Sequence, residues 1–406
     1  MKIHPEDPRV SYPPQSACEP LRFLPGGPHF GKPLVRRISR SLTESAQAVD
    51  YSAAFDRSER RVARLRQALE RERAEAPRLV AELLAGGAGR RERMLLNPPR
   101  LQTWGTAELL VERSRDESGA DPERGEELGL LAVRLAQSLD ADLYGSERLE
   151  DLRAEAWGYV ANARRRCSDL PGATAAFREA FAHLARGTGD PLERAVLLDL
   201  EASLLRSRCL HKRALRHLEQ ALSIFVEAGE KHRAGRVLLK MDSVHQRAGQ
   251  PELGIPLLYR ALDLIDPARE PRLLLYAWHS LIDDLIAAGR LMEAQGLYGR
   301  ARALSLRFPE PGTENRRKWL DGKLARRLGH AERAEELLLA ARAGFAARGV
   351  PYERALVSLD LASLYTEQGR SDELDRLEAE MVPLLSQSRA EKHAAALAAG
   401  FRAAEA

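Results

Sequence analysis

An internal repeat of about 40 residues constrains this chain of 406 residues more than any other feature of its sequence. When the chain is aligned against itself, one position recurs six times, at spacings of 41, 40, 40, 40 and 40 residues. These anchor positions are Ala173, Ala214, Gly254, Ala294, Ala334 and Leu374. Repeats with periods of roughly 20 to 50 residues are typical of arrays in which neighbouring units stack on one another.

The residues after each anchor predict one face of a helix. A large side chain stands four residues after five of the anchors, and an alanine stands three residues further on. The large residues are Phe177, Leu218, Leu258, Tyr298 and Leu338, and the alanines are Ala180, Ala221, Ala261, Ala301 and Ala341. Positions i, i+4 and i+7 share a helix face, so we expect small residues that admit a neighbouring helix and a large one that fills the gap.

A second predicted helix precedes each anchor helix. Residues Trp157, Leu198, Leu238 and Trp278 lie 16 residues before their anchors, and Trp319 lies one residue later in its unit. The turn between the two helices carries glycine in the later units, at Gly249, Gly289, Gly329 and Gly369. Glycine is favoured where a helix ends in the left-handed conformation. Each unit is therefore helix, tight turn, helix, and stacked units must build the core together.

This pattern resembles the tetratricopeptide repeat (TPR), a helical hairpin with Trp, Leu-Gly, Tyr, Ala, Phe, Ala and Pro at fixed offsets. The matching residues in the unit that starts at Ala154 are Trp157, Val160-Ala161, Ala173, Phe177 and Ala180. Arg164 replaces the tyrosine, and the closing proline is absent. The longer period is similar to the variant in kinesin light chains and in sensor domains of maltose-regulator-type activators. HEAT and armadillo arrays have a similar period but lack this tryptophan and Ala/Phe/Ala register.

The resemblance implies an all-α, right-handed superhelical TPR-like solenoid of about seven helical hairpins. Composition agrees, because aromatic residues make up only 5% of the chain and good helix formers dominate it. We expect a disordered Pro/Gly-rich leader over 1–35 and an N-terminal helical cap over 36–99. The repeat array is expected over 100–387, and a C-terminal capping helix over 388–406.

Motifs of catalysis are missing from the sequence. There is no phosphate-cradling glycine loop, nucleophile elbow, His-Glu-x-x-His or Cys-x-x-Cys motif. A metal site built from Cys167, Cys209, His211 and His217 is an alternative, but its ligand spacing is unlike that of known sites. We therefore predict a protein that is not an enzyme, with no catalytic residues, cofactor or metal.

Charge and hydropathy narrow the partners. The 63 basic and 59 acidic residues give a net charge of +4, and no apolar run is long enough to span a membrane. Widely spaced cysteines and the absence of an apolar signal region indicate a cytoplasmic protein in a reducing compartment. The basic pairs at Arg36, Arg60 and Arg90 alternate with glutamates, and no helix-turn-helix follows, so nucleic acid is not an expected partner.

The TPR resemblance implies that the first helix of each hairpin lines an inner groove. The groove positions that we select as partner contacts are Asn162, Arg165, Arg166, Arg206, Lys240, Arg247, Tyr276, His279, Lys323, Arg326 and Arg327. Arginine binds carboxylates with two parallel hydrogen bonds, so these residues favour an acidic partner. A bland alternative stays open, in which an arginine-rich chain carries arginine on every exposed face.

The carboxylate clamp of TPR co-chaperones is at best partial in this chain. Asn162 matches the first asparagine of the clamp, and Arg247 takes a place next to its usual basic residue. Gly158 stands where the first lysine belongs, and Ser203 where a further asparagine belongs.

Two functional hypotheses follow from the resemblance. The first is a non-catalytic scaffold or adaptor that binds a segment of a partner protein in the groove. The second is a regulatory sensor that binds a small ligand or signalling peptide and acts on a separate output protein, such as a transcription factor or protease. Neither hypothesis defines an oligomeric state.

Overall fold

The computed structural model describes residues 52–96 and 99–387. Within these ranges every regular element is helical, which confirms the predicted all-α class. No helix of the described part is both long and apolar enough to cross a membrane. The predicted leader over 1–35 and the capping helix over 388–406 lie outside the described residues, and the four predicted segment boundaries stay predictions.

The first helices of the described chain are α2 (Ser52–Leu84), α3 (Ala88–Leu96), the short 3-10 helix η1 (Pro99–Leu101), α4 (Trp104–Glu117), α5 (Pro122–Ser138) and α6 (Ala141–Tyr144). The following six are α7 (Ser146–Arg166), α8 (Leu170–Leu184), α9 (Pro191–Ser207), α10 (His211–Glu227), α11 (Lys231–Arg247) and α12 (Pro251–Leu264). The last six are α13 (Pro271–Ala287), α14 (Leu291–Ser305), α15 (Pro311–Arg327), α16 (Ala331–Ala347), α17 (Pro351–Glu367) and α18 (Ser371–Gln387).

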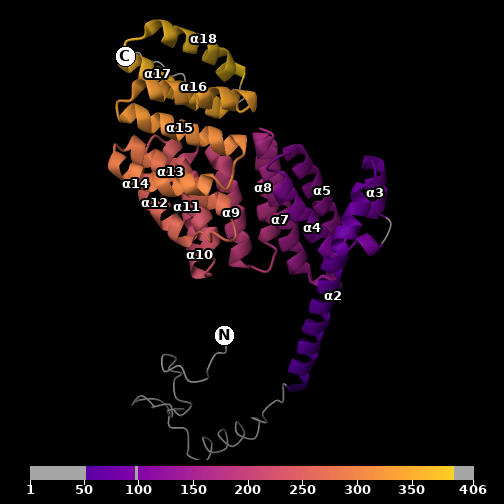
Figure 1. Cartoon of the computed structure of the whole chain (residues 1–406). Coiled ribbons are helices and arrows are strands. Elements are labelled where there is room, and N and C mark those ends of the chain that lie inside the picture. Colours follow the sequence, from indigo (N-terminus) through magenta and orange to yellow (C-terminus); the bar gives the residue numbers. More distant parts are fainter. Residues whose placement is uncertain (1–51, 97–98, 388–406) are drawn as a thin grey trace, which may run out of the picture. The chain divides into compact units, whose positions relative to one another are not determined.

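These helices form seven hairpins in the described part of the chain, in agreement with the prediction. The pairs are α4/α5, α7/α8, α9/α10, α11/α12, α13/α14, α15/α16 and α17/α18. From α7 to α18 each hairpin packs against the next one in the chain (Figure 1). The chain divides into two compact units after Arg64, and all seven hairpins belong to the second unit.

The repeat positions form the cores between these helices, as the spacing predicted. The anchors Ala173, Ala214, Ala294 and Ala334 are fully buried. The large residues and the later alanines join them, because Phe177, Leu218, Leu258, Leu338, Ala180, Ala221, Ala261, Ala301 and Ala341 are also buried. The tryptophans of the first helices pack against the same clusters.

The turn inside each hairpin has a left-handed residue, again at a 40-residue spacing. In the later units this residue is Gly249, Gly289, Gly329 or Gly369, with φ between 68° and 81°. In the two earlier units it is Ser168, with φ of 65°, or Cys209, with φ of 57°. Because a β-carbon disfavours this conformation, the two earlier turns are strained where the later ones are not.

Ser168→Gly is expected to stabilise the protein by about 0.5 to 1 kcal/mol, because glycine adopts the left-handed conformation without strain. The Ser168 side chain is exposed, so little packing is lost. Ser168→Ala keeps the β-carbon and serves as the control, with no gain in stability. Thermal unfolding followed by circular dichroism measures both variants, and equal stability of the two would contradict strain at this turn.

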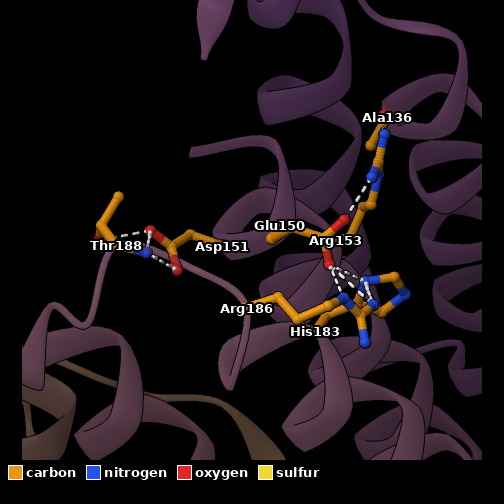
Figure 2. A network of polar contacts seen from close by, with 7 residues as sticks. All are labelled: Ala136, Glu150, Asp151, Arg153, His183, Arg186 and Thr188. Atoms are coloured by element: carbon orange, nitrogen blue, oxygen red, sulfur yellow. Dashed lines mark hydrogen bonds and ion pairs between the residues drawn. The ribbon is translucent and has the colours of Figure 1, made fainter. Parts of the chain in front are cut away.

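A polar network holds α7 against α8 (Figure 2). Glu150 on α7 accepts hydrogen bonds from Arg153 Nη1 at 2.6 Å and from Arg186 Nε at 2.9 Å. His183 Nδ1 on α8 lies 2.8 Å from Glu150 Oε2. Burial raises the pKa of Glu150, but these donors outweigh it and the pKa is lowered overall. The carboxylate therefore stays charged and keeps the hairpin together.

Two further bonds of this network extend to the neighbouring segments (Figure 2). Arg153 Nε donates to the carbonyl of Ala136 on α5, at 3.1 Å. Asp151 accepts from both the backbone N–H of Thr188, at 3.1 Å, and its hydroxyl, at 2.6 Å. These contacts fix α7, the helix whose last turn carries three arginines, relative to the hairpin before it and the link after it.

Candidate functional site

Three arginines end the first helices of three successive hairpins. Arg165, Arg206 and Arg247 lie in the last turns of α7, α9 and α11, and we call them the arginine cluster. The negative ends of the helix dipoles favour cations at these positions. The 41-residue spacing of the three residues brings them to the same end of neighbouring helices.

The hydrogen-bond partners of Arg165 and Arg206 are neutral. Arg165 donates to Asn162 Oδ1 from Nε at 3.1 Å and from Nη2 at 3.0 Å, and its Nη1 lies 3.5 Å from Ser207 Oγ. Arg206 donates from Nη1 to Ser243 Oγ on α11. Among the described residues, neither guanidinium forms an ion pair with a carboxylate. Their positive charge is therefore positioned by neutral groups and left uncompensated.

Arg247 contacts an aromatic ring far away in the sequence. Its guanidinium carbon lies 5.0 Å from the centroid of the Tyr352 ring on α17, a cation–π distance. Sequence reasoning missed Tyr352, because the repeat gives the position of a residue within its own unit and carries no signal about contacts 105 residues apart.

Burial and mutual repulsion act on the cluster together. Burial, with the charges of Arg206, Arg166 and Arg247, lowers the pKa of Arg165 to about 10. Burial and the charge of Arg247 also lower the pKa of Arg206. Both residues stay protonated at neutral pH, so like charges are gathered at one place. An anion bound there would relieve this repulsion.

The lysines predicted for the groove have carboxylate partners inside the protein. Lys240 Nζ on α11 lies 2.7 Å from Asp199 Oδ2 on α9. Lys323 and Arg316 on α15 both pair with Asp283 on α13, the latter at 3.2 Å. These cations bridge neighbouring first helices, so they hold the groove surface together.

The other predicted cations differ in their surroundings. Arg166 Nη2 donates to the carbonyl of Gly119, between α4 and α5, at 2.6 Å. Arg326 Nη1 donates to the carbonyl of Asp360 on α17 at 3.3 Å. Arg327 is exposed at the end of α15. These residues are not part of the arginine cluster.

The two predicted aromatic contacts also differ. The side chain of Tyr276 on α13 is 45% exposed. His279 is only 5% exposed, and its Nε2 lies 3.3 Å from Ser305 Oγ on α14. Burial, assisted by the charge of Arg316, lowers the pKa of His279 to about 4. This histidine is therefore neutral at pH 7 and lies in the packing between α13 and α14, where a partner does not reach it.

Neither a protein-family model nor a curated protein matches this chain. Solved structures do resemble it. Aspartyl phosphate phosphatase F from Bacillus subtilis matches with a TM-score of 0.57 and 13% identity, over 88% of this chain and 89% of that one. The apo form of RapI matches with a TM-score of 0.55 and 14% identity, over 70% of this chain and 99% of that one.

A third match is a Rap protein complexed with competence and sporulation factor, with a TM-score of 0.51 and 14% identity. It covers 69% of this chain and 76% of that one. At such identities the likeness concerns the fold alone, and it agrees with the repeated hairpins described above. The protein has a TPR-like fold. In this fold α7, α9, α11, α13, α15 and α17 are the first helices of their hairpins.

A larger hollow lies among α8, α9 and α10 of the TPR-like array. It encloses about 930 Å³, and Phe181, Leu198 and Ile224 are among the residues that line it. Its two titratable groups His217 and Glu201 are paired with each other at 3.1 Å. The hydrogen bond to Glu201 raises the pKa of His217. The hollow therefore offers apolar surface, in contrast to the uncompensated charge of the arginine cluster.

The metal alternative gains no support from the described residues. In that part of the chain no three His, Cys, Asp or Glu side chains are grouped so that they could hold a metal ion. Cys209 is the left-handed residue of its turn, which gives it a place in the backbone geometry. Cys167 lies next to the corresponding residue, Ser168, of the preceding hairpin.

Proposed function

We propose that this protein is a non-catalytic scaffold or adaptor that binds an acidic segment of a partner protein on its first helices. The observation that carries the proposal is the arginine cluster, whose members Arg165 and Arg206 have only neutral partners among the described residues. The complex of a Rap protein with competence and sporulation factor adds that a protein of similar fold is known in a bound form.

The physical argument concerns charge that is already in position. Each guanidinium is held by a neighbouring serine or asparagine, so little side-chain entropy is lost when an acidic group binds. Partial burial strengthens the electrostatic attraction relative to a fully solvated site. Rigid helices and preformed donors together favour a partner segment whose acidic residues match the cluster.

Arg206→Glu is expected to weaken partner binding by about 10- to 100-fold, because it places a carboxylate where the partner's acidic group binds. The partner is first captured from a lysate of the native host with the full chain, and its affinity is then measured by isothermal titration calorimetry. The control is Arg333→Glu, since Arg333 on the second helix α16 is paired with Glu336 and lies away from the cluster. Equal losses for the two variants, with intact circular dichroism, would contradict the proposed site.

The alternative is a regulatory sensor for a small ligand or signalling peptide, which acts on a separate output protein. A cavity of about 110 Å³ beside Arg206 favours this function, because it accommodates a small group. The two functions differ in one measurement. Small metabolites or short peptides raise the thermal unfolding temperature of a sensor in the absence of any protein, whereas a scaffold responds only to its protein partner.

A further inference from the structure

The cavity beside the arginine cluster lies among three first helices, α9, α11 and α13. Its lining residues are Arg206, Arg236, Leu239, Lys240, Ser243, Leu273 and Tyr276. Its volume of about 110 Å³ equals that of three to four water molecules, at about 30 Å³ each. A group of about five heavy atoms fits this space.

The charges around the cavity do not cancel. Arg236 Nη1 pairs with Glu270 at 2.7 Å, and Lys240 pairs with Asp199 at 2.7 Å. Each of these two pairs is neutral overall. Arg206 remains, with a serine as its hydrogen-bond partner.

Two more positive charges adjoin Arg206. The side chains of Arg165 and Arg247 are close enough to repel the guanidiniums of the cluster. A single carboxylate would offset one charge of the three. A phosphoryl group carries a charge of about −1.5 to −2 at neutral pH and three strong acceptor oxygens.

The donors around the cavity suit such a group. The planar fork of Arg206 can donate two parallel hydrogen bonds to phosphoryl oxygens. The hydroxyl of Ser243 accepts from Arg206 and keeps its own O–H for a further acceptor. Lys240 and the half-exposed Tyr276 line the same space and supply an ammonium and a phenol.

We propose that this cavity binds a phosphoryl dianion, with Arg206 as its main ligand and Ser243 and Lys240 as further donors. The inference rests on the proposed function, since it specifies the acidic group that the first helices bind. The dianion belongs either to a phosphorylated residue of the partner or to a free phosphate compound. Both sources share the chemistry that the cavity recognises.

The test titrates the full chain with inorganic phosphate, O-phosphoserine and glutamate at pH 7.5 and constant ionic strength, by calorimetry. Both phosphoryl compounds are expected to bind at least tenfold more tightly than glutamate. Arg206→Gln should reduce their affinity at least tenfold, Arg206→Lys should reduce it less, and Arg333→Gln should leave it unchanged. Tighter binding of O-phosphoserine assigns the site to a phosphorylated residue, and equal or tighter binding of inorganic phosphate assigns it to a free compound.

The proposal is overturned if glutamate binds as tightly as phosphate or if Arg206→Gln binds phosphate like the unchanged protein. The captured partner separates this outcome from a failure of the proposed function. If partner binding depends on Arg206 but survives phosphatase treatment of the partner, and phosphate does not bind, the scaffold stands and the phosphoryl site falls. If phosphate binds through Arg206 but no protein does, the site stands and the scaffold falls.

Discussion

Asp242→Asn is expected to stabilise the protein by about 3 kcal/mol at pH 9, because it removes one charge from a buried carboxyl pair. Asp242 on α11 and Asp284 on α13 are 0% and 1% exposed. Within the described structure, both oxygens of Asp242 and Oδ2 of Asp284 lack a donor, while Gln246 Nε2 donates to Asp284 Oδ1 at 2.7 Å. Two carboxyl groups in such a place are tolerated when they share one proton.

The pH dependence follows from that proton. Burial, with the hydrogen bond and the charge of Asp284, raises the pKa of Asp242 to about 9, and burial raises the pKa of Asp284 to about 6. Asp283 adds to the shift of Asp242, whereas Arg316 opposes it. An unfolded aspartate has a pKa near 3.9, so between about pH 4 and pH 9 the folded chain holds a proton that the unfolded chain has lost. Stability therefore falls as the pH rises through this window.

Thermal unfolding at pH 6, 7.5 and 9 measures this effect. The unfolding temperature of the unchanged protein should fall with pH, while that of Asp242→Asn should change much less between pH 6 and 9, because an amide donates to Asp284 at every pH. Asp263→Asn is the control, since Asp263 is exposed on α12 and should follow the unchanged protein. A constant unfolding temperature for the unchanged protein, or a less stable Asp242→Asn at pH 9, would contradict the shared proton.

The fold could be predicted from the sequence because one set of contacts is repeated. Each hairpin uses the same buried positions, so Ala173 and Phe177 in one unit have the same role as Ala334 and Leu338 in another. The turn could be predicted only in part. Four glycines marked it, but Ser168 and Cys209 adopt the same left-handed conformation without the residue type that signals it.

The candidate site could be predicted less well, because it depends on differences between units. The register placed Arg165, Arg206 and Arg247 at the ends of first helices, and the structure brings these three together. Register alone does not tell which cation has an internal carboxylate, and Lys240 and Lys323 turn out to be paired. Each pairing depends on where a neighbouring repeat places its aspartate.

The glycine anchor of one unit shows the same limit. The anchors of four other units are alanines, whereas Gly254 replaces alanine on α12. A β-carbon at Gly254 would lie 2.2 Å from Asp242 Oδ1 and 2.4 Å from Asp284 Oδ2. The carboxyl pair therefore occupies the space that an alanine methyl fills elsewhere. The substitution was visible in the sequence, but its cause lies on two other helices.

Gly105→Ala is expected to destabilise the protein by about 2 to 3 kcal/mol, because a β-carbon there meets backbone rather than a flexible side chain. Gly105 lies near the start of α4. Its β-carbon would be 2.6 Å from the carbonyl carbon of Glu72 and 2.7 Å from the backbone nitrogen of Arg73, both on α2. Relief of the clash requires the two helices to separate, with loss of buried contacts between them.

Gly296→Ala is the matched control, since Gly296 lies inside α14 and a β-carbon added there would have nothing within 4 Å of it. It should gain about 0.5 to 1 kcal/mol, because alanine favours a helix more than glycine does. Thermal unfolding compares the two variants, and hydrogen exchange over residues 65–84 should rise only in Gly105→Ala. Equal stability of both variants would contradict the close approach of α2 and α4.

The same variant separates the N-terminal helices from the binding surface. In a repeat array each unit contacts its neighbours only, so damage at α2 and α4 should leave α9 and α11 unchanged. The arginine cluster lies on α7, α9 and α11. Gly105→Ala should therefore bind the partner with unchanged affinity at a temperature where it is folded. A loss of affinity would instead place part of the binding surface on the helices that precede α5.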